Sequence, residues 1–239
     1  MSSPILDDFD RRAKTFQGLC DYLQSVLPAL LKSHKIRFHK LEGRVKKRKS
    51  LEEKLTRPDK NYTTLDNVTD ICGLRIITHY KSEVDQIATI IEREFAIDRD
   101  NSVDKRIYTD PDRFGYVSLH YVISLPEARL TLTECKAWKG YKAEIQIRTI
   151  LEHAWAEIEH DLGFKSSVAV PREVKRRFAR LAALLELADD EFADDEFAGI
   201  KADLAQYTAK VSERAQNCPT KCRDRRRIGK RVGRPRDGL

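Results

Sequence analysis

The stretch from Ala143 to Lys165 changes its hydrophobic period in the middle, and this change constrains the fold more than any other feature of the sequence. In its first part, polar and apolar residues alternate, which is the two-residue repeat of a strand with one buried face. From about Ile150 the apolar residues recur at intervals of three and four, as in an amphipathic helix. The sequence therefore predicts a strand that leads directly into a helix and carries Glu144, Gln146 and Arg148 on its polar face.

The composition is typical of a soluble, highly charged globular protein. Hydrophobic residues make up 41% of the 239 residues and charged residues 35%. No apolar run approaches the roughly 20 residues that span a bilayer, and the N-terminus lacks the basic and then apolar pattern of a signal peptide. The five scattered cysteines are typical of reduced thiols. We therefore expect a cytoplasmic protein without membrane partners.

The net charge of +7 is located at the C-terminus. Between Cys218 and the end, nine Lys and Arg residues stand against two Asp residues, so residues 1–217 are neutral overall. The high isoelectric point consequently does not make the folded part a nucleic-acid binder. We expect this basic tail, residues 217–239, to be disordered.

Hydrophobic periodicity and turn residues divide the rest of the chain into helices and strands. We expect helices over about Asp8–Lys40, from near Ser50, over Lys81–Phe95 and over residues 171–216, and strands within residues 68–80, 117–125 and 130–138, the last beside the strand at 143–149. Pro28 predicts a kink or break, Ser50 and Glu53 predict a capping box, and Gly73 predicts a bend before its strand. The domains expected are an N-terminal helical region (1–40), a core (41–170), C-terminal helices (171–216) and the tail.

A dense basic run lies at residues 43–55, where Arg44, Lys46, Lys47, Arg48 and Lys49 occupy five of the six positions from 44 to 49. A charge run of this kind is most often a solvated loop. Basic side chains close to the start of a helix can instead hold a polyphosphate. The run alone does not distinguish these two interpretations.

Asp70, His120 and Glu144 each lie on or beside a different predicted strand. Taken singly, they could be a cap, a core histidine and a surface ion pair. Two carboxylates that converge from neighbouring strands would suit a magnesium-dependent transfer to or from a nucleotide, with the basic run holding the phosphates.

Four motifs follow one another in a fixed order. They are Arg44-x-Lys46 with Ser50 and Lys54, then VTDICGLRI (68–76), GYVSLH (115–120) and EIQIRT (144–149), and the helix HAWAEIEHDLGFK follows. This order resembles the synthetase domain of the RelA/SpoT family, of the small alarmone synthetase type. The resemblance implies an α+β fold, with a nucleotidyltransferase-like mixed β-sheet flanked by helices and with long N- and C-terminal helices.

The resemblance also implies roles for the residues of the ATP side. Arg44, Lys46, Ser50 and Lys54 would bind the ATP phosphates, and Arg75 would contact the adenine. Asp70 would be a ligand of Mg²⁺, the expected cofactor. Glu144 would be the second metal ligand or the base for the attacking hydroxyl, in a catalytic group with His120 and Gln146.

On the acceptor side, Tyr116 would stack on the base and Arg113 would contact the acceptor. The implied reaction transfers the β,γ-pyrophosphate of ATP to the ribose 3′-hydroxyl of GDP or GTP. Its product is the (p)ppGpp alarmone of the bacterial stringent response. Related small synthetases often form homo-oligomers.

Two departures from the family pattern concern the acceptor side. The family's Pro-Lys-x-Asn-Gly is PDRFG at 111–115, so Asp112 replaces a lysine, and Val117 replaces an arginine. These departures indicate an alternative acceptor, the 3′ end of tRNA, as in toxic members of the family that an antitoxin can neutralise. The basic residues near Lys32–Lys40 would then contact the tRNA. A third interpretation is a non-catalytic regulator that binds nucleotides or RNA.

Overall fold

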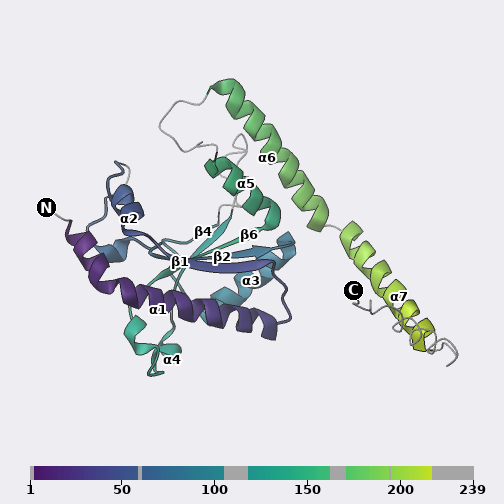
Figure 1. Cartoon of the computed structure of the whole chain (residues 1–239), viewed down its shortest axis with the longest axis horizontal. Helices are drawn as coiled ribbons and strands as arrows, with labels where there is room; N and C mark the ends of the chain where they lie inside the picture. Colours follow the sequence, from purple (N-terminus) through teal and green to yellow (C-terminus); the bar gives the residue numbers. More distant parts are fainter. Residues whose placement is uncertain (1–2, 59–60, 105–117, 162–170, 194, 217–239) are drawn as a thin grey trace, which may run out of the picture. The chain divides into compact units, whose positions relative to one another are not determined.

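A mixed six-stranded β-sheet lies at the centre of the fold (Figure 1). The structure is a computed structural model, and it describes residues 3–58, 61–104, 118–161, 171–193 and 195–216. The strand order is β1-β2-β6-β5-β3, and β4 pairs with β5. The strands are β1 (Lys40–Val45), β2 (Cys72–Thr78), β3 (Ala96–Ile97), β4 (Val103–Asp104), β5 (Leu119–Ser124) and β6 (Ala143–Thr149). Only β2 and β6 are parallel to each other among these pairs.

Helices cover both faces of this sheet. The helices of the described ranges are α1 (Pro4–Ser33), α2 (Arg48–Leu55), α3 (Lys81–Glu94), α4 (Glu127–Leu130), α5 (Ile150–Asp161), α6 (Arg172–Ala193) and α7 (Asp195–Gln216), with short 3₁₀ turns at Leu65–Asn67 and Lys136–Trp138. Figure 1 shows α1 and α3 on one side of the sheet and α5 on the other. The chain divides into two compact units, Met1–Ala193 and Asp194–Leu239, and α7 is the described part of the second.

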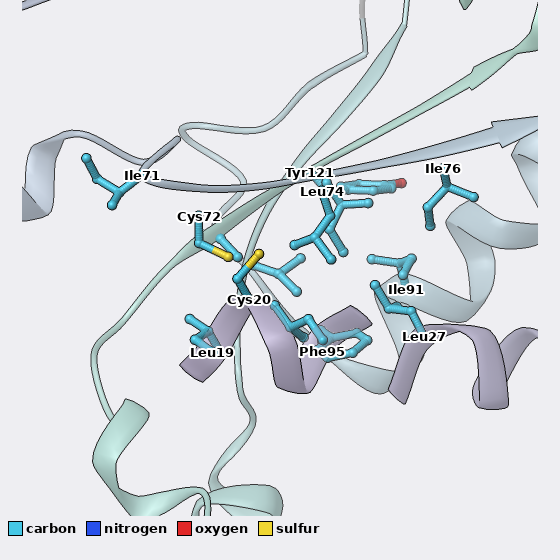
Figure 2. Packing of buried hydrophobic residues seen from close by; sticks show 14 of the residues in the cluster. Leu19, Cys20, Leu27, Ile71, Cys72, Leu74, Ile76, Ile91, Phe95 and Tyr121 are labelled. Carbon is cyan, nitrogen blue, oxygen red and sulfur yellow. The ribbon is translucent and has the colours of Figure 1, made fainter. Parts of the chain in front are cut away.

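The hydrophobic core lies between the sheet and the helices α1 and α3. Leu23, Leu27 and Leu31 of α1 are fully buried, and they pack in one cluster with Leu74 and Ile76 of β2. Figure 2 shows part of this cluster, in which side chains of α1 lie against those of β2 and α3. Burial of this continuous apolar face is the main stabilising contribution to the first unit.

The residues of β2 and β6 that alternate with the core residues lie on the other face of the sheet. Gly73 and Arg75 stand beside Glu144 and Gln146 in the parallel register, and the burial of both strands alternates over their first four residues. The alternation predicted for the polar face of β6 is thus confirmed.

Several predicted elements are confirmed. The fold is α+β, with a mixed sheet flanked by helices and a long N-terminal helix. The helix predicted over Lys81–Phe95 is α3, the strand within residues 117–125 is β5, and the predicted strand-to-helix change occurs at Thr149–Ile150. These segments have strong local periodicity, which is why the sequence alone revealed them.

The prediction of a helix as far as Lys40 was wrong. The helix α1 ends at Ser33, and Lys35 has a left-handed backbone conformation with φ of 59°. Lys40 begins β1, which pairs with β2 in antiparallel register. Pro28 does not break α1, because burial of the neighbouring leucines against the sheet compensates for its missing hydrogen bond.

The prediction of a strand at residues 130–138 was also wrong. The segment forms the end of α4 and a 3₁₀ turn, joined by local hydrogen bonds from Cys135 N to Leu132 O and from Trp138 N to Cys135 O. Strand β6 pairs with β2 and β5 instead.

The predicted capping box at Ser50 was wrong as well, because α2 begins two residues earlier and has Lys47 as an N-cap without a side-chain hydrogen bond. The predicted disordered tail lies outside the described residues. None of the helices in the described ranges has the length and apolar character needed to cross a membrane.

Candidate active site

A pocket of about 570 Å³ opens on the polar face of the sheet, above β1, β2 and β6. Its lining includes most of the residues that the sequence motifs single out. They are Arg44, Lys46, Ser50, Asp70, Arg75, Glu144 and Gln146, and Glu42, Lys47 and Gly73 are among their neighbours in the wall. Residues separated by as many as 104 positions thus share one cavity.

Strand register explains how the pocket forms. Arg44 is the cross-strand partner of Gly73, and Gly73 is the partner of Glu144. Because Gly73 has no side chain, space is left between the guanidinium side chain and the carboxylate side chain. A Cβ atom built at Gly73 would have only the backbone oxygen of Arg44 within 4 Å, at 3.9 Å. Gly73 lies within β2 and forms part of the pocket wall. The prediction of a bend at Gly73 before the strand was therefore wrong.

Asp70 lies just before β2 and binds two lysine side chains. Its Oδ2 is 3.0 Å from Lys46 Nζ, and its Oδ1 is 2.9 Å from Lys54 Nζ. Burial by itself would raise the pKa of Asp70, but the hydrogen bond from Lys54 and the charge of Lys46 outweigh burial and lower that pKa. The carboxylate is consequently ionised at neutral pH, as a metal ligand must be.

Glu144 lies near the start of β6, within a small polar group. Gln146 Nε2 donates a hydrogen bond of 2.6 Å to Glu144 Oε1, and His120 Nδ1 of β5 lies 3.6 Å from the same oxygen. His120 Nε2 is in turn 2.5 Å from Ser118 Oγ. These contacts fix the orientation of the Glu144 carboxylate at the wall of the pocket.

Arg75 is held from two sides. Its Nη1 donates to Glu42 Oε1 at 3.3 Å and to Glu157 Oε1 at 3.0 Å. These two hydrogen bonds hold the guanidinium of Arg75 at the pocket wall.

Arg148 lies on the same face of the sheet and is 5% exposed. Its burial and the nearby charge of Arg75 lower the pKa of Arg148 to about 10.

The structure brings most of the predicted site residues together in the pocket lining. Lys54 and His120 are not part of that lining, but Lys54 contacts Asp70 and His120 contacts Glu144. Arg113 and Tyr116 lie outside the described residues, so the acceptor side remains a prediction.

Sequence reasoning missed Glu42 and Glu157. The alternation of Glu42 and Arg44 is a weak signal for a shared strand face, and nothing in the sequence indicated that Glu157 reaches Arg75.

The donor set of the pocket fits a magnesium ion that is bound together with phosphates. Asp70 and Glu144 supply carboxylate oxygens, which Mg²⁺ prefers. Within the described ranges, no group of three or more His, Cys, Asp or Glu residues could hold a metal ion. Mg²⁺ is commonly bound by only one or two carboxylates plus substrate phosphates. Such an ion would thus need oxygen ligands from a nucleotide.

Comparisons with known proteins identify relatives of this chain. The family model described as "Region found in RelA / SpoT proteins" matches residues 43–169. The chain is 35% identical over 152 residues to GTP pyrophosphokinase YjbM of Bacillus subtilis (strain 168), covering 63% of this chain and 68% of the relative. It is 31% identical over 153 residues to GTP pyrophosphokinase YwaC of the same organism, covering 63% and 70%.

The fold is also that of a solved structure. The small alarmone synthetase 1 from Bacillus subtilis bound to its product pppGpp superimposes with a TM-score of 0.66, at 24% identity, over 83% of this chain and 99% of that chain. The segment that the family model matches contains the end of β1 and all of β2, β5 and β6, whose side chains line or adjoin the pocket. The chain therefore belongs to the RelA/SpoT family.

Proposed function

We propose that this protein is an ATP-dependent pyrophosphokinase that makes (p)ppGpp from GDP or GTP. The observation that carries the proposal is that Asp70 and Glu144 line the same pocket as a group of cationic side chains. The names of the relatives support it, since YjbM and YwaC are GTP pyrophosphokinases. The product-bound relative supports a guanosine acceptor.

The cationic side chains would bind ATP. Arg44 and Lys46 line the pocket beside Ser50, where they can hold the phosphates, and Lys54 adjoins them through Asp70. Arg75 at the pocket edge can lie against the adenine. Such binding places the β-phosphorus for in-line attack, which is the main contribution of the protein to phosphoryl-type transfer.

Glu144 would remove the proton from the attacking hydroxyl. The 3′-oxygen of the acceptor forms a bond to the β-phosphorus of ATP, the bond from that phosphorus to the α–β bridging oxygen breaks, and AMP leaves. Glu144 accepts the hydroxyl proton, while Gln146 and His120 hold its carboxylate in position. The basic side chains neutralise the charge that develops on the phosphate oxygens.

Asp70 would hold Mg²⁺ at the nucleotide phosphates. In the alternative assignment, Glu144 is the second ligand of the ion and not the base. When bound, the ion would supply charge neutralisation at those oxygens. The lowered pKa of Asp70 keeps this ligand ionised over the neutral range.

A label-transfer assay tests the function. Purified protein, Mg²⁺ and ATP labelled at the γ-phosphate are offered GDP, GTP and deacylated tRNA separately. We expect label on GDP or GTP, and we expect Glu144→Gln to lower the rate about 10²- to 10⁴-fold, the usual contribution of a general base. Glu134→Gln, at an exposed position outside the pocket, is the matched control.

The same assay separates the alternatives. Label on tRNA alone would identify the 3′ end of tRNA as the acceptor, and it would agree with Asp112 and Val117 in place of the family's cations. Nucleotide binding without transfer to any of the three acceptors would indicate a non-catalytic regulator. A homo-oligomer and an antitoxin partner stay predictions from the family resemblance.

A further inference from the structure

Asp70 is engaged by an ammonium group at each of its two oxygens. Lys46 Nζ lies 3.0 Å from Oδ2, and Lys54 Nζ lies 2.9 Å from Oδ1. All three side chains are mostly buried, with exposed fractions of 19% for Lys46, 20% for Lys54 and 23% for Asp70. A divalent cation that approached either oxygen would therefore meet an ammonium group already bound there. The two lysines occupy the place of a metal ion at this carboxylate.

The charges around the pocket oppose entry of a free cation. Four cationic side chains line the pocket, Arg44, Lys46, Lys47 and Arg75, against three carboxylates, Glu42, Asp70 and Glu144. The excess of positive charge repels a free divalent ion but attracts a metal–nucleoside triphosphate complex, whose net charge is negative.

Both lysines can change partners without moving the backbone. The backbone N–H of Lys46 is fixed by a 2.8 Å hydrogen bond to Ile71 O, and Lys54 lies on α2 with its Nζ 5.5 Å from the ring centre of Tyr62. A lysine side chain has a flexible four-carbon stem and three rotatable donors. Rotation of this stem can take each Nζ from the carboxylate to a phosphate oxygen in the same pocket.

We propose that Lys46 and Lys54 act as exchangeable counterions of Asp70, so that the divalent cation enters together with the nucleotide and not before it. On binding, the phosphates take the two ammonium groups and the metal ion takes the carboxylate. This inference rests on the proposed function, because it takes a metal–ATP complex as the ligand.

Removal of a residue that simply helps to bind a ligand weakens the binding of that ligand. The exchange predicts instead that removal of either lysine strengthens the binding of the free metal ion. In the absence of nucleotide, Lys46→Met and Lys54→Met should each tighten the binding of Mn²⁺ by about three- to tenfold, because a competing cation is removed. Mn²⁺ binding to the full chain is measured by electron paramagnetic resonance of the free ion. Lys54→Arg retains the counterion and should keep the wild-type affinity. Lys14→Met, at an exposed position of α1, should do the same.

A second measurement needs no variant. With ¹⁵N-labelled lysine in the wild type, Mg²⁺ alone should leave the signals of the ion-paired ammonium groups unchanged, whereas Mg²⁺ with a non-hydrolysable ATP analogue should shift them. Unchanged or weaker Mn²⁺ binding in both Met variants would overturn the proposal. Equal shifts with Mg²⁺ alone would overturn it too.

These results are independent of the transfer assay. If the Met variants bind Mn²⁺ more tightly but no acceptor is labelled, the exchange stands and the proposed function fails. If label reaches GDP or GTP but the Met variants do not gain affinity for Mn²⁺, the function stands and the exchange is wrong.

Discussion

Arg75 of β2 and Glu157 of α5 form an ion pair, with 3.0 Å between Arg75 Nη1 and Glu157 Oε1, although they lie 82 positions apart in the sequence. The helix that follows β6 thereby holds a side chain of the neighbouring strand at the pocket edge. Arg75 is 24% exposed and Glu157 58%, so the pair is partly solvated and contributes modestly to stability.

The first prediction concerns this pair. We expect Glu157→Gln to raise KM for ATP about two- to fivefold with little change in kcat, because Arg75 loses one of its two acceptors but keeps Glu42. Steady-state kinetics with varied ATP measure both constants. Glu159→Gln on the same helix is the control. A fall in kcat with an unchanged KM would contradict the positioning of Arg75 by Glu157.

The second prediction concerns Gly73. We expect Gly73→Leu to weaken ATP binding at least about tenfold, because its side chain would fill the space between Arg44 and Glu144. Thermal stability should not fall, since a glycine inside a strand is itself unfavourable. Calorimetry with ATP and thermal unfolding measure the two effects, and Gly73→Ala should give an intermediate loss of affinity. Unimpaired ATP binding by the Leu variant would place ATP elsewhere.

The third prediction is a pH dependence at Asp189. This carboxylate of α6 is fully buried, and its Oδ2 accepts a 2.8 Å hydrogen bond from Thr149 Oγ1. Burial raises the pKa of Asp189, although the bond from Thr149 opposes the rise. The neutral acid is therefore favoured in the folded state. Its stabilising contribution is complete below the pKa of the unfolded chain, near 3.8, and is lost as the pH rises through the raised pKa.

We consequently expect Asp189→Asn to have a higher Tm than the wild type at pH 7, and the difference should shrink as the pH approaches 4. Thermal unfolding at a series of pH values measures this. Asp190→Asn, at the exposed neighbour that pairs with Lys81, should not show the same increase. A constant difference in Tm at all pH values would contradict titration of Asp189 as the cause.

The fourth prediction concerns the attachment of α1. We expect Leu27→Ala to lower the free energy of unfolding by about 2–5 kcal/mol, because Leu27 is fully buried in the core and its loss leaves a cavity. Leu181→Ala, on α6, where the side chain is 54% exposed, should cost much less. Denaturant unfolding compares the two variants, and equal costs would argue against the packing of α1 on the sheet.

Local patterns in the chain were sufficient to predict α3, β5 and the change from β6 to α5. In these segments the period of apolar residues reflects the period of the backbone, which depends only on near neighbours. The motifs likewise named many of the side chains that line the pocket, because the functions proposed for them, binding of phosphate and metal, require particular residue types.

Contacts between distant segments decided the rest. Strand β1 has a charged, glycine-containing sequence with little strand propensity, and it forms because its backbone pairs with β2. Strand β6 joined β2 and β5, and residues 130–138 turned locally instead of pairing. The two lysines on Asp70 and the carboxylate of Glu157 on Arg75 also depend on this packing. Ion pairs across such separations have no periodic signal, because only the folded sheet brings their charges within a few ångströms of one another.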